Sequence, residues 1–490
     1  MLARRNAEAS ESMERRIAAG AAWTAASNWI EQAFAFAVFV AIARFIGADA
    51  FGVAAMALAF VTLGEVLLRD TLAEGLISAD NSQRRHEDSA FWALILFAVA
   101  ILAILVLAAP IAAKMFGDAR VAPVMQAMAP TCLFVAISGV PTAKLRRDMA
   151  FRTLAIRAIA GVVAGGGVGL WMAANGFGAW SLVGQRLTLT SVNALLAVTG
   201  ARWLPLSPPW SADLSLVKGL GPRVVILRAL IIIIMQTPVV ALGVAANASA
   251  VAMYSFAARI VEIAIFLIVA PVKRVVQPAA AAMKRAGGDT KAFFTDVTAI
   301  TALAAFAVFA GLAFVGETFV SVLMGDEWRL AGAIIAPLCA AGALTALTEI
   351  QEGYLLALDR SSRFVRATFA EAAIGVALIA LAGASGAAAV ATAVALRAAI
   401  MAPIRTAAAL SAENISASRY FSALSGPLAA AAAMAVVLQL WRIVAEGRIP
   451  SIGYLTASII VGAASFALAA AMAAPTTFRR LRVYFSKETS

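Results

Sequence analysis

Long apolar runs are the feature that most constrains what this chain can fold into. A helix needs roughly 20 mostly apolar residues to cross a bilayer, and a helix satisfies its backbone hydrogen bonds internally where no water is available. The sequence therefore predicts an all-α polytopic membrane protein with about 14 transmembrane helices. We expect these helices near residues 17–43, 50–68, 89–112, 121–141, 153–173, 177–199, 222–245, 250–272, 293–316, 331–355, 365–382, 385–408, 423–443 and 451–474.

The composition excludes several classes of protein. Hydrophobic residues make up 62% of the 490 residues and charged residues 13%, which excludes a soluble globular protein and a disordered chain. Cys132 and Cys339 lie inside apolar runs and His86 is the single histidine. We therefore expect no disulfide framework and no metal site. No Walker-type glycine loop is present, so we expect no ATP hydrolysis and no cofactor.

The distribution of Lys and Arg predicts how the chain is oriented. If both termini and every loop after an even-numbered helix are cytoplasmic, those segments carry 29 of the 39 basic residues and the opposite loops carry six. Cytoplasmic loops of membrane proteins are enriched in Lys and Arg. We therefore predict cytoplasmic termini and interpret the net charge of +12 as an orientation signal that also attracts anionic membrane lipids. Nucleic acid is not an expected partner.

A weak internal repeat divides the chain. Short segments recur in order at offsets of 198 to 208 residues and at equivalent helix ends. The pairs are Asp49–Ala54 with Asn247–Ala252, Gly117–Asp118 with Gly325–Asp326, Ala129–Cys132 with Ala336–Cys339, and the turns 176–178 with 383–386. We predict two six-helix lobes, 1–205 and 206–415, followed by two additional helices and a basic tail in 416–490. Because six is even, the lobes would be related by an axis along the membrane normal.

Three segments carry a family resemblance. They are Val140–Pro141 followed by the basic stretch Lys144–Arg152, the turn Gly176–Val183 with its Gly-Phe-Gly-Ala-Trp core, and Gly325–Trp328 before an apolar helix. In these features the chain resembles the polysaccharide-transporter branch of the multidrug/oligosaccharidyl-lipid/polysaccharide flippase superfamily, which includes the Wzx-type flippases. The likeness extends over about residues 16 to 480 and depends on the combination of segments, since small-residue turns are common in membrane proteins.

The resemblance implies a fold and a function. It implies two helical bundles facing a central cleft lined by helices one, two, seven and eight. It also implies alternating-access transport of polyprenyl-diphosphate-linked oligosaccharide across a bacterial cytoplasmic (inner) membrane, for exopolysaccharide or lipopolysaccharide biosynthesis. Expected partners are this lipid-linked oligosaccharide, anionic lipids and polysaccharide polymerase machinery. The alternative within the superfamily is a cation-coupled multidrug or small-molecule exporter, for which an acid-dominated cavity would be typical.

A membrane enzyme is the competing class of function. Multipass glycosyltransferases and polymer ligases place acid, His or Arg clusters in long extramembrane loops. The extracytoplasmic loops predicted here are short and poor in such groups, and the longer loops near 69–88 and 201–221 contain no convincing acid–base pair. We therefore expect a transporter, with no catalytic residues.

Four arginines inside predicted helices are candidates for binding the diphosphate, because an intramembrane charge is costly and guanidinium matches phosphate oxygens. Each has a plainer alternative. Arg259 either contacts phosphate or forms an ion pair with Glu262, and Arg228 either contacts phosphate or extends to the membrane interface. Arg186 and Arg397, at nearly equivalent places in the two lobes, either contribute one cation each or bond to neighbouring helices.

Acidic residues inside helices are candidates for ion coupling, because a buried carboxyl can take up and release a proton. These candidates are Glu31, Glu262, Glu349 and Glu352. For Glu31, the first choice, the alternative is ordinary polar pairing within the bundle. Glu65 is expected to form a local salt bridge with Arg69, one helical turn away.

Two further expectations concern packing. Gly161, Gly165 and Gly169 recur every four residues, which favours close approach of a neighbouring helix. The proline-rich linker between the lobes contains Trp203 and Trp210, and we expect both at the membrane interface.

Overall fold

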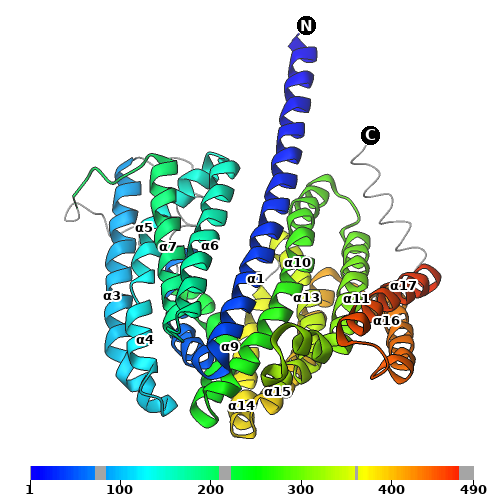
Figure 1. Cartoon of the computed structure of the whole chain (residues 1–490). Coiled ribbons are helices and arrows are strands. Elements are labelled where there is room, and N and C mark those ends of the chain that lie inside the picture. The colour runs from blue at the N-terminus through cyan, green and yellow to red at the C-terminus, as the bar shows by residue number, and fades with distance from the viewer. Residues whose placement is uncertain (1, 72–83, 209–221, 359–361, 474–490) are drawn as a thin grey trace. The chain divides into compact units, whose positions relative to one another are not determined.

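In the part of the chain that it describes, the computed structural model consists of helices joined by turns and short irregular segments (Figure 1). It describes residues 2–71, 84–208, 222–358 and 362–473, with side chains for 29–69, 84–208, 229–358 and 366–473. No strand occurs within these ranges. The chain divides into two compact units, Met1–Ile233 and Ile234–Ser490. This division falls inside a helix, and the predicted lobe boundaries remain predictions.

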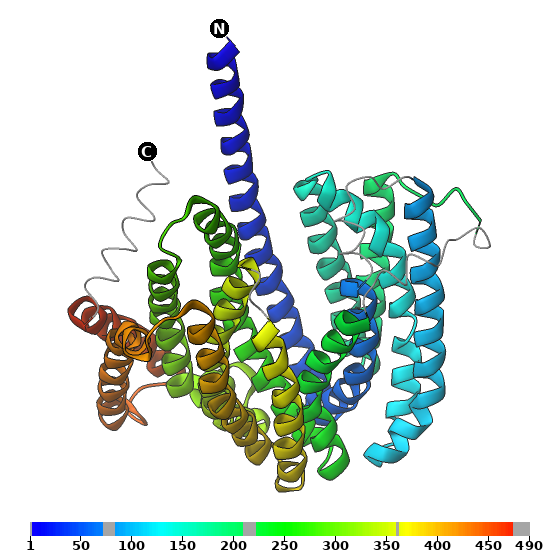
Figure 2. The same cartoon turned by 180° about the vertical axis from the view of Figure 1, so that it is seen from behind.

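Unit 1 is a bundle of antiparallel helices (Figure 2). Its longest helix, α1, breaks at Gly47, whose φ of 76° and ψ of 168° are not helical. Only glycine adopts such a conformation readily. The helices of unit 1 are α1 (Leu2–Thr71), α3 (Arg84–Phe116), α4 (Val121–Met128), α5 (Thr131–Arg147), α6 (Phe151–Ala174), α7 (Trp180–Ala201) and the first half of α9 (Pro222–Ala245).

The glycines of α6 bring neighbouring helices close. A Cβ atom on Gly165 would lie 2.7 Å from the backbone oxygen of Gln185 on α7, and one on Gly169 would lie 2.7 Å from Ile42 on α1. Neither contact has space for a methyl group. The predicted packing role of the spaced glycines is therefore confirmed, and it fixes α6 against α7 and α1.

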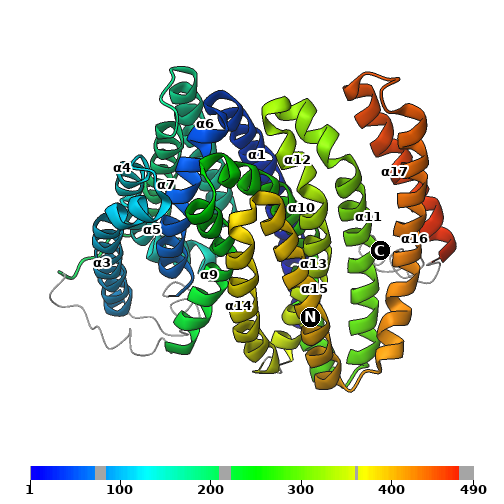
Figure 3. The same cartoon turned by 90° about the horizontal axis from the view of Figure 1, so that it is seen from below.

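Unit 2 contains the remaining helices. They are the second half of α9, α10 (Ala248–Ala286), α11 (Thr290–Met324), the short helices η2 (Asp326–Trp328) and α12 (Arg329–Ala333), α13 (Ile335–Ala357), α14 (Ser362–Ala382), η3 (Gly383–Ser385), α15 (Ala387–Glu413), α16 (Ala417–Ala445) and α17 (Ser451–Ala473). The last two pack along α11, where Leu303, Met434 and Phe466 share one buried cluster (Figure 3). The C-terminal pair is thus attached to unit 2 through α11.

Each unit contains a short helix directly before a longer one. In unit 1 a short helix, α4, is separated from α5 by Ala129 and Pro130. In unit 2 the short α12 is separated from α13 by Ile334, three residues before Pro337. Proline donates no backbone hydrogen bond and interrupts a helix. Each of the windows predicted at 121–141 and 331–355 therefore forms two helical pieces.

The structure confirms an all-α polytopic membrane protein. Ten helices in the described residues are long and apolar enough to cross a membrane, or 11 if η2 to α13 are one span. Helix α1 counts as one span where the sequence predicts two, α7 is too polar to qualify, and the described side chains of α9 cover only Ala229–Ala245. Large apolar side chains on α3 remain exposed, including Leu107 at 76%, as expected for a surface that faces lipid.

Candidate functional site

Glu65 forms its ion pair with a distant residue of the sequence. The carboxylate on α1 is 2% exposed and pairs with the Arg186 guanidinium of α7, through both Nε and Nη2. The local salt bridge expected between Glu65 and Arg69 is therefore not its main contact. Arg186, a candidate ligand for diphosphate, already has an anionic partner inside unit 1.

Arg157 is a half-buried cation on α6 that the charge count included among the cytoplasmic basic residues. Its Nη1 donates a hydrogen bond of 2.5 Å to Thr142 Oγ1 on α5. Its Nε is buried and has no hydrogen-bond partner. Arg157 also interacts electrostatically with Glu31 on α1 and with the cations Arg69 and Arg146. The first-choice acid of the sequence analysis thus lies beside a guanidinium.

Arg259 and Glu262 form the ion pair that their spacing allows. Arg259 Nη1 lies 3.5 Å from Glu262 Oε2, and the two side chains are 40% and 48% exposed. Helix α10 buries Phe256 and Ile260 against its own unit, so this pair occupies a face of α10 that remains uncovered. A half-exposed, weakly held pair can exchange its partner for a ligand more easily than a buried one.

Arg397 belongs to a three-residue cluster in unit 2. Glu371 on α14 accepts an ion pair from Arg405 and lies 3.7 Å from Arg397 Nε, both arginines being on α15. All three side chains are 14% exposed. Arg397 also packs over Gly375, where a Cβ atom would lie 2.7 Å from its Cδ. The cluster has one positive charge in excess, held within unit 2.

The remaining candidates have different surroundings. Glu349 on α13 forms a 2.8 Å ion pair with Lys273 on α10. This lysine lies inside α10, which extends to Ala286, well beyond the window predicted at 250–272. Glu352, one turn from Glu349, is half-buried on the same helix. The backbone of Arg228 is part of α9, but its side chain is not among those that the structure describes. All eight candidates remain predictions as binding or coupling residues.

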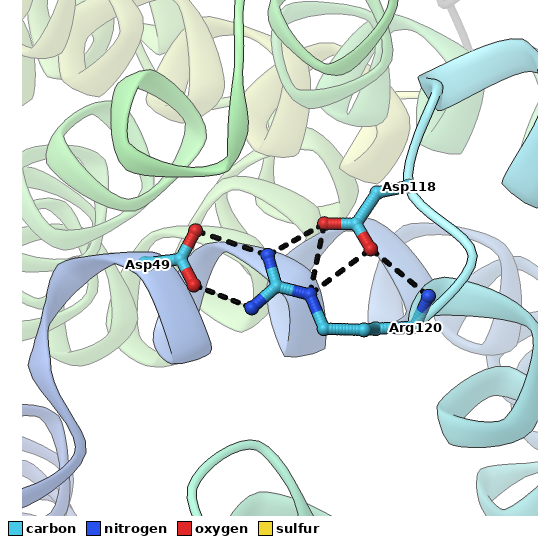
Figure 4. Close-up of polar contacts among 3 residues, drawn as sticks. All are labelled: Asp49, Asp118 and Arg120. Carbon is cyan, nitrogen blue, oxygen red and sulfur yellow. Dashed lines mark hydrogen bonds and ion pairs between the residues drawn. The ribbon is translucent and has the colours of Figure 1, made fainter.

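A charged turn joins α1 to the loop between α3 and α4 (Figure 4). Arg120 donates to Asp118 through Nη2 at 2.7 Å and to Asp49 through Nη1 at 2.5 Å. The hydrogen bonds from Arg120 hold the pKa of Asp118 below its ordinary value of 3.8, and the two carboxylates raise the pKa of Arg120. Arg120 and Asp49 are more than half exposed. The contact therefore fastens the start of the second half of α1 at one end of unit 1.

The opposite end of unit 1 has its own polar contacts. Glu87 on α3 binds Lys144 at 2.8 Å and Arg147 at 3.1 Å, both at the end of α5. The chain after α7 lies against α3: Asp88 accepts the backbone N–H of Ser207 at 2.9 Å. Trp203 is 3% exposed and packs against Phe91. The Trp203 ring is therefore covered by protein, its expected place at the membrane interface stays a prediction, and Trp210 lies outside the described residues.

The sequence analysis did not select Arg157 and Arg405 as intramembrane charges. It also did not predict that Glu371 is the acid shared by Arg397 and Arg405. Arg157 and Arg405 lie inside α6 and α15. They also lie inside the windows predicted at 153–173 and 385–408, but the charge count included them among the 29 cytoplasmic basic residues. For Arg157, the available signal was the absence of glycine and proline within three residues on either side. No group of three or more His, Cys, Asp or Glu residues that could hold a metal occurs in the described ranges.

Each unit contains both charge-balanced ion pairs and a cluster in which basic side chains outnumber acidic ones. Glu65–Arg186 and Glu349–Lys273 are balanced, whereas the clusters around Arg157 and Glu371 contain more guanidinium than carboxylate. Guanidinium forks bind planar and tetrahedral oxyanions in a bidentate manner. The arrangement is therefore suited to holding phosphate groups.

The sequence matches one known protein family. The sequence profile of the family described as polysaccharide biosynthesis protein matches residues 41–332. No curated protein is similar enough in sequence to match this chain.

Solved structures with a similar fold are membrane transporters. Lipid II flippase MurJ in its inward closed conformation is 11% identical, with a TM-score of 0.76, over 92% of this chain and 98% of that chain. An inward-facing multidrug resistance MATE family transporter of the MOP superfamily is 14% identical, with a TM-score of 0.61, over 79% of this chain and 96% of that chain. At these identities the likeness shows the fold alone.

Proposed function

The chain belongs to the polysaccharide biosynthesis protein family, and from this membership we propose that it is a flippase for polyprenyl-diphosphate-linked oligosaccharide. The family match over residues 41–332 is the observation that carries the proposal. The MurJ-like fold supports it, because lipid II flippase MurJ has the same architecture. The proposal includes a bacterial cytoplasmic membrane, cytoplasmic termini, and anionic lipids and polysaccharide polymerase machinery as partners.

The physical task explains why such a protein needs no bond-making chemistry. Each sugar hydroxyl that enters hydrocarbon without a hydrogen-bond partner costs roughly 2–7 kcal/mol. An oligosaccharide carries many hydroxyls, so spontaneous crossing is very slow. A protein that opens a polar path alternately to the two sides removes most of this barrier by offering water and polar side chains.

Within this proposal, Arg259 is the strongest of the three arginine candidates whose side chains the structure describes. Its side chain is 40% exposed and its only described ion pair is the 3.5 Å contact with Glu262. Arg186 and Arg397 are more buried and are closely associated with Glu65 and Glu371. Binding a phosphate would cost Arg259 less reorganisation than it would cost the other two.

The test is the sidedness of the lipid-linked oligosaccharide in cells with and without the gene. An externally added glycan-modifying enzyme reports how much oligosaccharide has reached the outer leaflet. We expect cytoplasmic-leaflet accumulation on deletion and recovery on complementation. Complementation with Arg259→Ala is expected to restore less transport than complementation with Arg186→Ala. Arg329→Ala, at an exposed position at the start of α12, is the matched control at equal protein level.

Two outcomes would contradict parts of this proposal. Unchanged sidedness in a strain without a redundant transporter would favour the exporter alternative, which shares the MATE-type fold. Equal losses for Arg259→Ala and Arg186→Ala would contradict the assignment of Arg259 alone.

A further inference from the structure

Unit 1 contains a group of cations that the four arginine candidates do not include. We call it the Arg157 cluster: Arg69, Arg146 and Arg157 with the single acid Glu31. Arg157 interacts electrostatically with the other three. Among the described residues, neither Arg69 nor Arg146 forms an ion pair, and both side chains are exposed. The cluster therefore has two positive charges in excess.

The positions of these residues along their helices place all four at a similar depth in the membrane. Arg157 lies six residues after Phe151, about 9 Å into α6 at 1.5 Å per residue. Arg146 is the penultimate residue of α5, and Arg69 lies two residues before the end of α1. Glu31 precedes the break at Gly47 by 16 residues, about 24 Å of helix. With a hydrocarbon core of about 30 Å, all four lie in the half predicted to be cytoplasmic.

Two unpartnered polar atoms mark a place for a ligand or water beside Arg157. Arg157 Nε and Asn193 Oδ1 are both buried without a hydrogen-bond partner. Asn193 on α7 packs against Gly161, one helical turn beyond Arg157, where a Cβ atom would lie 2.8 Å from its Nδ2. Buried polar atoms in proteins are nearly always hydrogen-bonded. A free donor on α6, and a free acceptor on α7 that packs beside the next turn of α6, therefore indicate a missing polar group.

Thr142 holds the guanidinium in place while leaving donors available. Its hydroxyl accepts from Arg157 Nη1 at 2.5 Å, so the remaining N–H groups of the fork are not committed to it. A guanidinium anchored at one nitrogen can still bind an oxyanion through two others. The charge of the cluster matches a diphosphate, which carries about two negative charges.

We propose that the Arg157 cluster is a diphosphate-binding site on the cytoplasmic side of unit 1, where the carrier's head group binds before transport. Arg157 would bind directly, Arg69 and Arg146 would attract the anion, and Glu31 would compete with it for Arg157. This inference rests on the proposed function, which it deepens by naming the residues that first hold the cargo. It is independent of Arg259 and of unit 2.

Binding can be measured without transport. The full-length protein is placed in phosphatidylcholine nanodiscs and titrated with a fluorescent farnesyl diphosphate, which has the carrier's chemistry without sugar. We expect Arg157→Gln to raise Kd at least tenfold and Arg146→Gln to raise it at least threefold. Glu31→Gln is expected to lower Kd severalfold, because it removes the competing carboxylate. Arg442→Gln, on an exposed face of α16, is the matched control and should leave Kd unchanged.

The Glu31 variant separates binding from folding. If Arg157 had only a structural role, removing the charge of its neighbour would weaken binding or leave it unchanged, and would not tighten it. If Arg157→Gln does not fold, as judged by its melting temperature and monodispersity, Glu31→Gln and Arg146→Gln decide the matter. A folded Arg157→Gln protein with unchanged Kd, or weaker binding by Glu31→Gln, would overturn the proposal.

Competition identifies the ligand. Inorganic pyrophosphate should displace the probe, whereas exchanging the nanodisc lipid for phosphatidylglycerol should change Kd less than threefold. Strong displacement by phosphatidylglycerol would instead assign the site to ordinary anionic lipid and overturn the proposal.

The failure of this site can be told apart from the failure of the proposed function. If transport proceeds in cells while Arg157→Gln binds normally, this site is wrong and the proposed function stands. If binding needs Arg157 but sidedness does not change on deletion, the proposed function fails and the site stands.

Discussion

Single charged residues inside these helices are stabilised by partners on other helices. Glu65 is almost fully buried and pairs with Arg186 across α1 and α7. A buried ion pair adds little net stability compared with apolar residues, but removing one partner leaves an uncompensated charge. The main effect of the pair is therefore on substitutions: replacing one partner is costly, although the intact pair adds little stability to unit 1.

This asymmetry gives a measurable prediction. Arg186→Met leaves the Glu65 carboxylate buried without a cation, so we expect the free energy of unfolding to fall by about 3 kcal/mol or more. The double variant Glu65→Gln with Arg186→Met should recover most of that loss. Denaturant unfolding in detergent measures both, with Arg329→Gln as control because its pair with Glu317 is exposed. An additive double variant would argue against the pairing.

The candidate site was only partly predictable at this scale. Residue type and hydropathy are enough to select Arg186, Arg259 and Arg397 as intramembrane charges. They do not give the rotation of each helix about its axis, so the partners Glu65 and Glu371 could not be assigned. Arg157 was missed because the charge count assigned it to the cytoplasmic segments, although it lies inside the window predicted at 153–173 and inside α6.

At the scale of elements, the spacing of small residues on α6 determines how closely α7 approaches. A Cβ atom at Gly165 would meet backbone of α7, which cannot move away as a side chain can. Gly167, on the same helix, has nothing within 4 Å of its Cβ position. Both glycines lie in the middle of α6, but only Gly165 faces a neighbouring helix at close range.

We predict opposite outcomes for alanine at these two positions. Gly165→Ala should lower the free energy of unfolding by roughly 1–3 kcal/mol, because the methyl group overpacks the contact. Gly167→Ala should be neutral or should stabilise the helix by up to about 1 kcal/mol, because alanine is the better helix former. Thermal unfolding of both variants in the same detergent provides the comparison. Equal effects would mean that α6 and α7 can separate without cost.

Helix existence was predicted well and helix continuity was not. Every one of the 14 apolar windows coincides with helix in the structure, because hydropathy and length determine that property. The breaks at Ala129–Pro130 and at Ile334 were not predicted. A proline inside a membrane helix either kinks it or interrupts it, and neighbouring helices decide which. The sequence alone does not contain that information.

At the scale of the whole molecule, the chain's two cysteines make its orientation accessible to labelling. Cys132 and Cys339 are both free and buried, so the native protein gives little background with a membrane-impermeant maleimide. Exposed turns occur on the side predicted to be cytoplasmic and on the opposite side. Gly288 lies between α10 and α11, and Arg448 lies between α16 and α17.

We predict that these two turns lie on opposite sides of the membrane. In intact cells the impermeant maleimide should label Arg448→Cys, and it should label Gly288→Cys only after permeabilisation. This follows from the cytoplasmic excess of Lys and Arg. Protein with neither substitution is the control for the buried cysteines. Labelling of Gly288→Cys in intact cells would reverse the predicted orientation.

The charged turn around Arg120 has a consequence for how the protein responds to salinity. At the corresponding turn of unit 2, after Gly325, the equivalent place is taken by Trp328, which is buried against Phe256 at 5.0 Å between ring centroids. Salt screens exposed charges over about 10 Å at 0.1 M, while sulfate-type salts strengthen apolar burial. A screening salt is therefore expected to weaken the Arg120 turn, and a sulfate-type salt is expected to strengthen the apolar contact of Trp328 as well, so the two turns respond differently to the ionic medium.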